Sequence, residues 1–174
     1  MVLESRLDNW HGFFVETGDE DRVKERLKYR LPEDFIVMVP KRKLRVRKGG
    51  IWKVETKVLF PGYVLVNGII DDEIYYRLKN IPNVFRLLMS GNDIVAIERR
   101  EMTVLSHLIC NGEEIGFSNV LMENGRARVL DGPLFSLEGI ILSIDKRKER
   151  AKIRLDFLGE ERTVDLGISL LGPV

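Results

Sequence analysis

The apolar positions of the first 110 residues follow two different periods. Short continuous apolar runs at 10–15 (WHGFFV) and 35–39 (FIVMV) are typical of buried strands. Between these runs, apolar residues recur every four positions behind an acidic cap candidate, Asp19 or Asp21, which predicts a helix. The charged stretch at 41–58, KRKLRVRKGGIWKVETKV, has a Gly-Gly pair at its middle and predicts a β-hairpin.

The next fifty residues continue this mixture of strands and helices. LFPGYVLV at 59–66 predicts a bend at its Pro-Gly pair followed by a strand, because an apolar, β-branched run begins directly after the turn. Two more helices are expected, one opening at Asp71 or Asp72 and one at about 98–110. The order of elements predicts an α+β sandwich, with helices packed against an antiparallel sheet.

The pattern changes after residue 110. The stretch NGEEIGFSN at 111–119 has two glycines, two asparagines and little periodicity, which favours a linker. Residues 120–174 contain short alternating stretches separated by turn signals, without a convincing amphipathic helix, and such spacing predicts a small β-barrel. We therefore expect one domain at 1–110, a linker at 111–119 and a second domain at 120–174.

The composition narrows the chemistry. The 174 residues include 28 Lys and Arg against 27 Asp and Glu, a net charge of +1, so any nucleic-acid-binding surface must be local. One cysteine, Cys110, cannot form an internal disulfide framework, and the two histidines, His11 and His107, lie outside ligand-spaced motifs. Phosphate-loop, dinucleotide and nucleophile motifs are missing. We therefore expect a binding protein and not an enzyme, with no catalytic residue, no metal site and no cofactor.

The signals of a membrane protein are also missing from the sequence. No apolar run approaches the ~20 residues that cross a bilayer, and the first residues, MVLESRLDNW, do not resemble a signal peptide. We expect a soluble cytoplasmic protein that has no membrane partner.

The predicted hairpin at 41–58 is strongly basic, with Glu55 as its one acidic residue. Four of its cations alternate, so that in a strand they would share one face: Lys41, Lys43, Arg45 and Arg47. Contact with the nucleic-acid backbone is the natural use of such a face, and it would not depend on base sequence. The alternative is a solvated strand edge that prevents aggregation.

A second basic segment lies at 146–154, with six cations and one anion, Glu149. Nine basic and nine acidic residues cancel over 119–174, so this segment is a local patch. Three of its cations alternate with apolar residues, which predicts a strand with one buried and one cationic face. We expect an RNA stem-loop to bind a patch made of these cations and two arginines of the preceding strand: Arg126, Arg128, Lys146, Arg147, Lys148, Arg150, Lys152 and Arg154. The alternative is a solvated hairpin.

Several stretches together resemble the NusG family of transcription elongation factors: Trp10 at the first strand, LFPGYVLV at 59–66, IPNV at 81–84, DGPLFSLEGIILSID at 131–145 and IRLDFLGEERTVDL at 153–166. The resemblance covers nearly the whole chain and implies an amino-terminal NGN domain followed by a KOW domain, without enzymatic activity. It implies that the first domain binds the clamp helices of RNA polymerase through an apolar surface formed by Phe14, Phe60, Pro61 and Tyr63. Trp10 itself is expected in the core. The resemblance also places the basic hairpin near the non-template DNA strand, and we expect the protein to be a monomer.

Three positions separate this chain from the usual NusG pattern. Leu134, Leu137 and Leu158 stand where such proteins usually have Phe, and those aromatics help to dock the termination factor Rho and a ribosomal protein. Together with the basic segment at 146–154, this departure resembles the specialised paralog LoaP. LoaP is an antiterminator of long biosynthetic operons whose KOW domain binds an RNA hairpin. The alternative is a general NusG elongation factor whose KOW domain docks Rho or a ribosomal protein.

Overall fold

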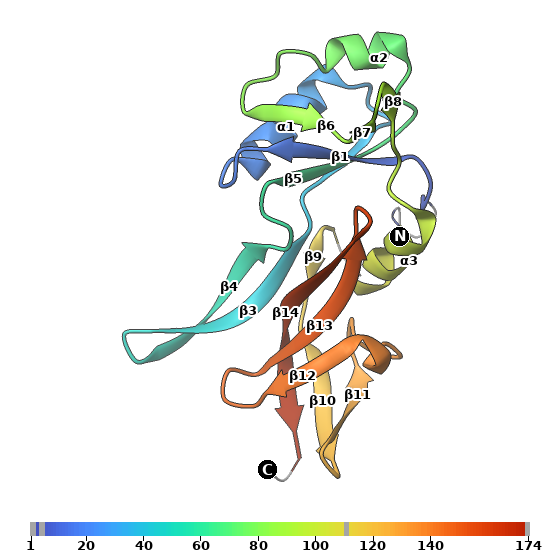
Figure 1. Cartoon of the computed structure of the whole chain (residues 1–174). Helices are drawn as coiled ribbons and strands as arrows, with labels where there is room; N and C mark the ends of the chain where they lie inside the picture. Colours follow the sequence, from blue (N-terminus) through green and yellow to red (C-terminus); the bar gives the residue numbers. More distant parts are fainter. Residues whose placement is uncertain (1–2, 4–5, 110–111, 173–174) are drawn as a thin grey trace. The chain divides into compact units, whose positions relative to one another are not determined.

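The structure is a computed structural model that describes residues 3, 6–109 and 112–172 (Figure 1). Packing within the chain separates two compact units. Unit 1 comprises Met1–Pro40 and Phe60–Ser106, and unit 2 comprises Lys41–Leu59 and His107–Val174. The hairpin at 41–58 therefore belongs to the same unit as residues 107–174, which we call the tail. The predicted division near residue 110 placed this hairpin in the first domain. That division into 1–110, 111–119 and 120–174 stays a prediction.

Unit 1 is built on a four-stranded antiparallel sheet with the order β2-β5-β1-β6. Its strands are β1 (Trp10–Val15), β2 (Ile36–Met38), β5 (Tyr63–Asn67) and β6 (Val84–Leu87), and a small ribbon follows, formed by β7 (Met89–Ser90) and β8 (Asp93–Ile94). The two central strands, β1 and β5, are buried on both faces for most of their length. Such burial requires a continuous apolar run, so the expected strands at 10–15, at 35–39 and in LFPGYVLV are confirmed.

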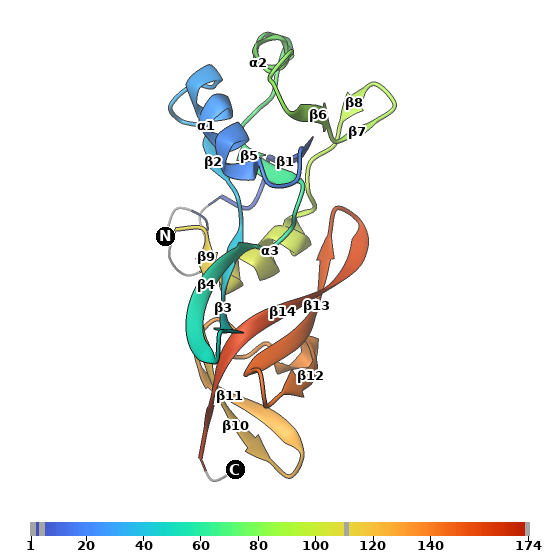
Figure 2. The same ribbon diagram turned by 90° about the vertical axis from the view of Figure 1, so that its left-hand side faces the viewer.

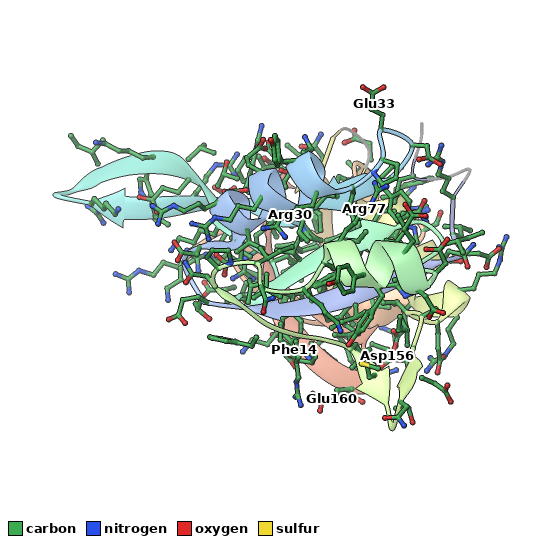
Figure 3. The ribbon with its side chains drawn as sticks, turned by 90° about the horizontal axis from the view of Figure 1, so that it is seen from above. Phe14, Arg30, Glu33, Arg77, Asp156 and Glu160 are labelled. Carbon is green, nitrogen blue, oxygen red and sulfur yellow. The ribbon has the colours of Figure 1, made fainter. Side chains whose placement is uncertain are left out.

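The three expected helices are present as α1 (Glu20–Arg30), α2 (Asp72–Arg77) and α3 (Arg99–Leu108). The apolar stripe of α1 is fully buried at Val23 and Leu27. The Asp71 carboxylate caps α2 by accepting a hydrogen bond from the amide three residues later at 2.8 Å. Arg30 and Arg77, labelled in Figure 3, join the first two helices, because the Arg30 guanidinium donates to the Arg77 carbonyl oxygen at 3.2 Å. Every helix in the described part of the chain is too short or too polar to cross a bilayer.

The core of unit 1 contains Trp10, which is completely buried and donates its indole N–H to the Arg6 carbonyl oxygen at 2.7 Å. The expectation that Trp10 fills the core is therefore confirmed. His11, the next residue, is also buried, and its Nε2 lies 3.1 Å from the Gly68 carbonyl oxygen. Burial lowers the pKa of His11 from its ordinary value, because the charged imidazolium would lose its hydration there.

Unit 2 contains the hairpin and a curled five-stranded sheet with the order β11-β10-β14-β13-β12. The hairpin strands, β3 (Lys41–Lys48) and β4 (Ile51–Val58), meet at Gly49 and Gly50, whose φ angles are 57° and 79°. Two adjacent residues with positive φ match the twist of a two-residue hairpin turn. The sheet strands are β10 (Ser118–Glu123), β11 (Arg126–Asp131), β12 (Ile141–Asp145), β13 (Arg150–Phe157) and β14 (Glu160–Leu171), with the short helix η1 (Glu138–Ile140) before β12. The α+β class with a barrel-like tail is thus confirmed.

Strand β13 shows how the core of the tail forms. It pairs antiparallel with β12 on one side and with β14 on the other. Ala151, Ile153 and Leu155 are buried, whereas Lys152 and Arg154 are exposed. The predicted alternation of one buried and one cationic face is therefore confirmed, because successive side chains of a strand point to opposite faces.

The segment predicted as a linker carries strand structure in its described part. Strand β9 (Glu114–Ile115) pairs in parallel with Lys41–Arg42 of β3, and β10 begins at Ser118. Residue 111 lies outside the described residues. The partner of β9 is far away in the sequence, so no local period of apolar residues could reveal this pairing.

Candidate nucleic-acid and protein interfaces

Three side chains form a row across the sheet of unit 1, and we call them the aromatic row. Tyr63 on β5 and Arg86 on β6 are the direct partners of Phe14 on β1, so the three side chains share one face. The centroids of the Phe14 and Tyr63 rings lie 5.0 Å apart, and the Arg86 guanidinium lies 4.5 Å from the Phe14 centroid. Phe14, labelled in Figure 3, is half-buried. The row therefore combines a partly exposed aromatic pair with one cation.

The bend before β5 is fixed by a buried carboxylate. Glu20 is 3% exposed, and its carboxylate accepts hydrogen bonds from the amides of Gly18 at 3.0 Å and Gly62 at 2.9 Å. Pro61 is exposed at the tip of this bend. Phe60, however, is 3% exposed, which corrects its expected place on the polymerase-facing surface. Its ring belongs to the core, because a large apolar side chain is stabilised most where it loses contact with water.

Sequence reasoning missed Arg86 as a member of the aromatic row. Arg86 lies two residues after the IPNV motif, which marks the approach to β6 but not the register of that strand. The register against β1 shifts between Phe14 and Val15. This irregularity follows the pairing that puts Arg86 opposite Phe14, and it is a property of the pair of strands and not of either sequence alone.

The hairpin cations that were expected to share a face are partly occupied by the tail. The Lys41 ammonium lies 2.9 Å from the Glu113 carboxylate, and the Lys43 ammonium lies 3.5 Å from the Glu114 carboxylate. Both carboxylates belong to the segment that pairs with β3 through β9. Arg47, near the turn of the hairpin, is exposed.

Arg45 makes the most contacts of this face. Its guanidinium donates hydrogen bonds to the Ile168 carbonyl oxygen and, at 2.9 Å, to the Ser169 hydroxyl. It also lies 4.3 Å from the centroid of the Phe117 ring and 3.6 Å from the Glu149 carboxylate. Arg45 therefore holds β3 against the tail and is not available to a phosphate in this arrangement.

The opposite face of β3 also meets the tail, and Figure 2 shows β3 running beside β14. The Arg42 guanidinium donates to the Asp165 carbonyl oxygen at 2.8 Å. Burial lowers the pKa of Arg42, while nearby Asp165 raises it and nearby Arg150 lowers it. A Cβ atom at Gly167 of β14 would lie 2.5 Å from the Lys43 carbonyl oxygen, so the two strands touch through their backbones.

The second basic segment lines a surface hollow of about 520 Å³ at the outer face of β12 and β13. Four cations surround it, Lys146, Lys148, Arg150 and Lys152, and we call this group the cationic hollow. Its two acidic neighbours are Asp145 and Asp165. The Asp145 carboxylate accepts a hydrogen bond from the Lys148 amide at 2.9 Å, which fixes the turn between the strands. The Arg150 guanidinium lies 3.9 Å from the Asp165 carboxylate. The hollow therefore keeps an excess of positive charge.

The other four residues of the predicted RNA-binding patch lie outside the cationic hollow. Arg147 is exposed on the turn, and the Arg154 guanidinium lies 3.8 Å from the Glu161 carboxylate. Arg126 and Arg128 lie on β11, which β10 and β14 separate from β13 in the sheet. The sequence could not show this separation, because it depends on the order of strands and not on their spacing along the chain.

The three leucines that depart from the NusG pattern occupy different environments. Leu134 is completely buried, and its amide donates to the Ser118 hydroxyl at 2.9 Å. Leu137 and Leu158 are half-buried. The neighbouring Phe135 is 51% exposed and was not identified from the sequence, so the tail does present an aromatic ring on its surface.

The sequence and the fold place this chain among known proteins. The family described as Transcription termination factor nusG matches residues 8–106, which is more than half of the chain. The chain belongs to the NusG family. The resemblance to the NusG family is thereby confirmed, and the matched residues include LFPGYVLV at 59–66.

Relatives of this NusG-family chain are similar over nearly its whole length. The transcription termination/antitermination protein NusG of Bacillus subtilis is 29% identical over 91% of this chain and 94% of its own. The protein of the same name from Escherichia coli is 27% identical over 97% of each chain. Among solved structures, one titled "Domain interaction in Thermotoga maritima NusG" matches with a TM-score of 0.60 and 25% identity over 91% of this chain and 93% of its own. These names are general, so membership of a specialised type stays a prediction.

Proposed function

We propose that this NusG-type transcription factor binds RNA polymerase through unit 1 and an RNA stem-loop through the tail, and promotes processive transcription of long operons as LoaP does. The observation that carries the proposal is the cationic hollow, where four cations from one hairpin surround a concave surface. The four cations outnumber the two carboxylates of the lining, and a concave surface with an excess of positive charge attracts a phosphate backbone that can enter it.

The aromatic row is the proposed contact with the clamp helices of the polymerase. Rigid aromatic rings bury a large area with little loss of conformational entropy, and they are enriched at the centres of protein interfaces. Phe14 and Tyr63 supply the rings, Pro61 lies at the adjacent bend, and Arg86 adds a charge that could select an acidic partner. Phe60 is left out of this surface because it is buried.

The cationic hollow suits a folded RNA better than a sequence-reading contact to duplex DNA. Its cations surround a depression, whereas sequence reading in a DNA major groove needs side chains that project from a helix or ribbon to the base edges. Lys146, Lys148 and Lys152 line the hollow with ammonium groups, and Arg150 is oriented by Asp165 and by a hydrogen bond that it donates to the Arg45 carbonyl oxygen at 3.2 Å. Shape and phosphate geometry at a stem-loop can be read by such groups without contact to base edges. The protein would act as a monomer. Non-template DNA would be a further partner, bound by the hairpin of β3 and β4.

The second candidate function is that of a general NusG factor whose tail docks Rho or a ribosomal protein. The observation that favours it is the exposure of Phe135, at 51%, with Leu142 exposed at 55% in the same unit. Exposed apolar residues of this size can anchor a protein partner. The two functions differ in which surface of the tail is used, so one experiment can separate them.

The test is a titration of the full chain with RNA stem-loops, single-stranded RNA and duplex DNA at two salt concentrations. We expect tight binding to particular stem-loops that survives physiological salt. Replacing Lys146, Lys148 and Lys152 by Ala should weaken that binding roughly 100-fold and reduce its salt dependence. The matched control replaces Arg22, Lys24 and Lys28 of α1 by Ala, which removes the same charge from unit 1 and should leave binding nearly unchanged.

Two results would contradict the proposal. Equal binding to all three nucleic acids that disappears in physiological salt would show only a phosphate-attracting patch. Loss of a ribosomal-protein or Rho complex on Phe135→Ala, without any RNA binding by the parent chain, would establish the general NusG function instead.

A further inference from the structure

The tip of the basic hairpin, residues 47–54, carries apolar side chains that nothing in its own strands explains. Trp52 is 47% exposed, Val54 is 57% exposed and Ile51 is 62% exposed. A solvated edge strand that only prevents aggregation would place charges or Pro at these positions, because exposed apolar residues on a strand edge favour association. Trp52 is therefore a large aromatic side chain that remains about half exposed in the folded hairpin.

The register of the hairpin assigns these side chains to two faces. Trp52 is the direct partner of Arg47, and Val54 is the direct partner of Arg45, so Trp52 and Val54 share the face of the alternating cations. Arg45 is used by the tail, but Arg47 is exposed. Trp52 and Arg47 thus form a ring and a guanidinium side by side at the end of the hairpin.

The other face of the tip is cationic. Lys48, Lys53 and Lys57 gather near Glu55, which is the one acidic residue of the hairpin sequence. The Glu55 carboxylate pairs with the Lys48 ammonium and lies 3.9 Å from the Lys57 ammonium. The hydrogen bond from Lys48 and the charges of the lysines hold the pKa of Glu55 below its ordinary value, which reflects a positive local field.

We infer that the hairpin tip is a platform for unpaired bases of a single-stranded nucleic acid, with a base stacked on Trp52 and a flanking phosphate on Arg47, which shares its face. An indole ring can stack on any base, and neighbouring cations hold the backbone, which is the combination that proteins use to bind single strands without sequence preference. The strongly positive surroundings disfavour a second copy of the same tip. A positively charged surface attracts a polyanion such as a nucleic acid. It does not complement a purely apolar protein surface.

This inference extends the contact of the hairpin with nucleic acid and is independent of the cationic hollow. The hollow is lined by β12, β13, their turn and Asp165 of β14, whereas the tip is built from β3 and β4. The tip supplies a stacking ring, and the hollow has none among its lining residues. The two sites should therefore prefer different nucleic acids, single strands at the tip and folded RNA at the hollow.

The experiment titrates the full chain, carrying Lys146→Ala, Lys148→Ala and Lys152→Ala to silence the hollow, with oligothymidylate and oligouridylate of about 12 nucleotides. Binding is followed by anisotropy of a labelled strand and by tryptophan fluorescence. The chain has two tryptophans, and Trp10 is buried, so quenching by a stacked base reports on Trp52. We expect both single strands to bind and to quench, and a duplex of equal length to bind more weakly. A preference for DNA or for RNA identifies the natural source of the strand.

Variants of the tip separate stacking from charge. Trp52→Ala should weaken binding roughly 10- to 100-fold, whereas Trp52→Phe should keep most of the affinity and lose the quenching. Ile51→Ala is the matched control, because it truncates an exposed apolar neighbour on the other face and should change binding less than about 2-fold. Arg47→Ala should reduce the slope of the salt dependence by about 0.7.

Three outcomes would overturn the inference. One is equal affinity for the duplex and the single strands, because stacking requires unpaired bases. Another is unchanged binding by the Trp52→Ala variant. The third is concentration-dependent self-association or capture of purified polymerase that requires Trp52 while no oligonucleotide binds, which would make the tip a protein-docking surface. Because the hollow is silenced in this titration, its result does not depend on whether the proposed stem-loop function is correct.

Discussion

Strands β3 and β13 have the same alternation of cations, and the molecule uses the two strands in opposite ways. On β3, Lys41 and Lys43 form ion pairs with carboxylates next to or within β9, and the Arg45 guanidinium donates a hydrogen bond to the backbone of β14. On β13, Lys152 is exposed beside an open hollow. The difference arises because β9 and β14 run along β3, whereas β13 meets β3 at Arg150, whose guanidinium donates to the Arg45 carbonyl oxygen at 3.2 Å, and leaves Lys152 exposed. Alternating charge defines a face, and neighbouring elements decide whether that face is a contact or a binding surface.

The largest effect is expected when one cation is removed from each of β3 and β13 and the stabilities of the two variants are compared. Arg45→Ala should lower the free energy of unfolding by about 3 kcal/mol, because charge-assisted hydrogen bonds are lost and Glu149 loses a neighbour. Lys152→Ala should change it by less than about 0.5 kcal/mol, because its side chain is exposed. Urea unfolding measures both. Equal effects of the two substitutions would mean that β3 is not held by the tail.

The backbone contact between β3 and β14 offers a second test. Gly167→Ala should destabilise the chain by about 1–3 kcal/mol, because the new Cβ would lie 2.5 Å from the Lys43 carbonyl oxygen and still closer to the Phe117 ring. Gly139→Ala is the matched control, since its Cβ would meet open space. Both glycines lie in unit 2, and thermal unfolding compares them directly. A Gly167→Ala variant as stable as the control would place the hairpin away from β14 in solution.

A change of pH distinguishes unit 1 from both basic strands. The folded state lowers the pKa of His11, so the unfolded chain binds a proton more readily below about 6.5. The stability that His11 contributes is therefore present above this pH and is lost as the pH falls toward the lowered pKa of the folded state. His11→Gln should flatten this dependence, as followed by Trp10 fluorescence in a Trp52→Phe background. His107→Gln, the control, should leave it in place.

The smallest effect is expected at the hairpin tip. Since the pKa of Glu55 is lowered in the folded state, its contribution to stability is present above the pKa of an unfolded Glu and is lost as the pH falls through the lower value. Glu55→Gln should remove this part of the acid dependence. It should also tighten oligonucleotide binding slightly, because Lys48 loses its partner. Carboxyl NMR titration and the anisotropy assay measure the two effects, and weaker binding by Glu55→Gln would contradict the electrostatic account of the tip.

Much of the local structure could be predicted, because it is set by neighbours along the chain. The turn at Gly49 and Gly50, the cap at Asp71 and the inner face of β13 follow from residue type and period. The site was less predictable. Phe60 is an aromatic residue beside a surface turn, and its burial in the core becomes evident only in the folded chain.

The amino-acid sequence by itself determined most of the elements, the alternation of their faces and the membership of the NusG family, because these depend on short-range periods and on motifs such as LFPGYVLV. The tertiary structure alone decided which cations remain available. Lys43 and Arg45 meet their partners through strands distant in the sequence, whereas Arg47 and Lys152 meet none of comparable strength among the described residues. Electrostatic pairing depends on distance in space. The order of strands sets this distance, and it cannot be inferred from a local sequence pattern.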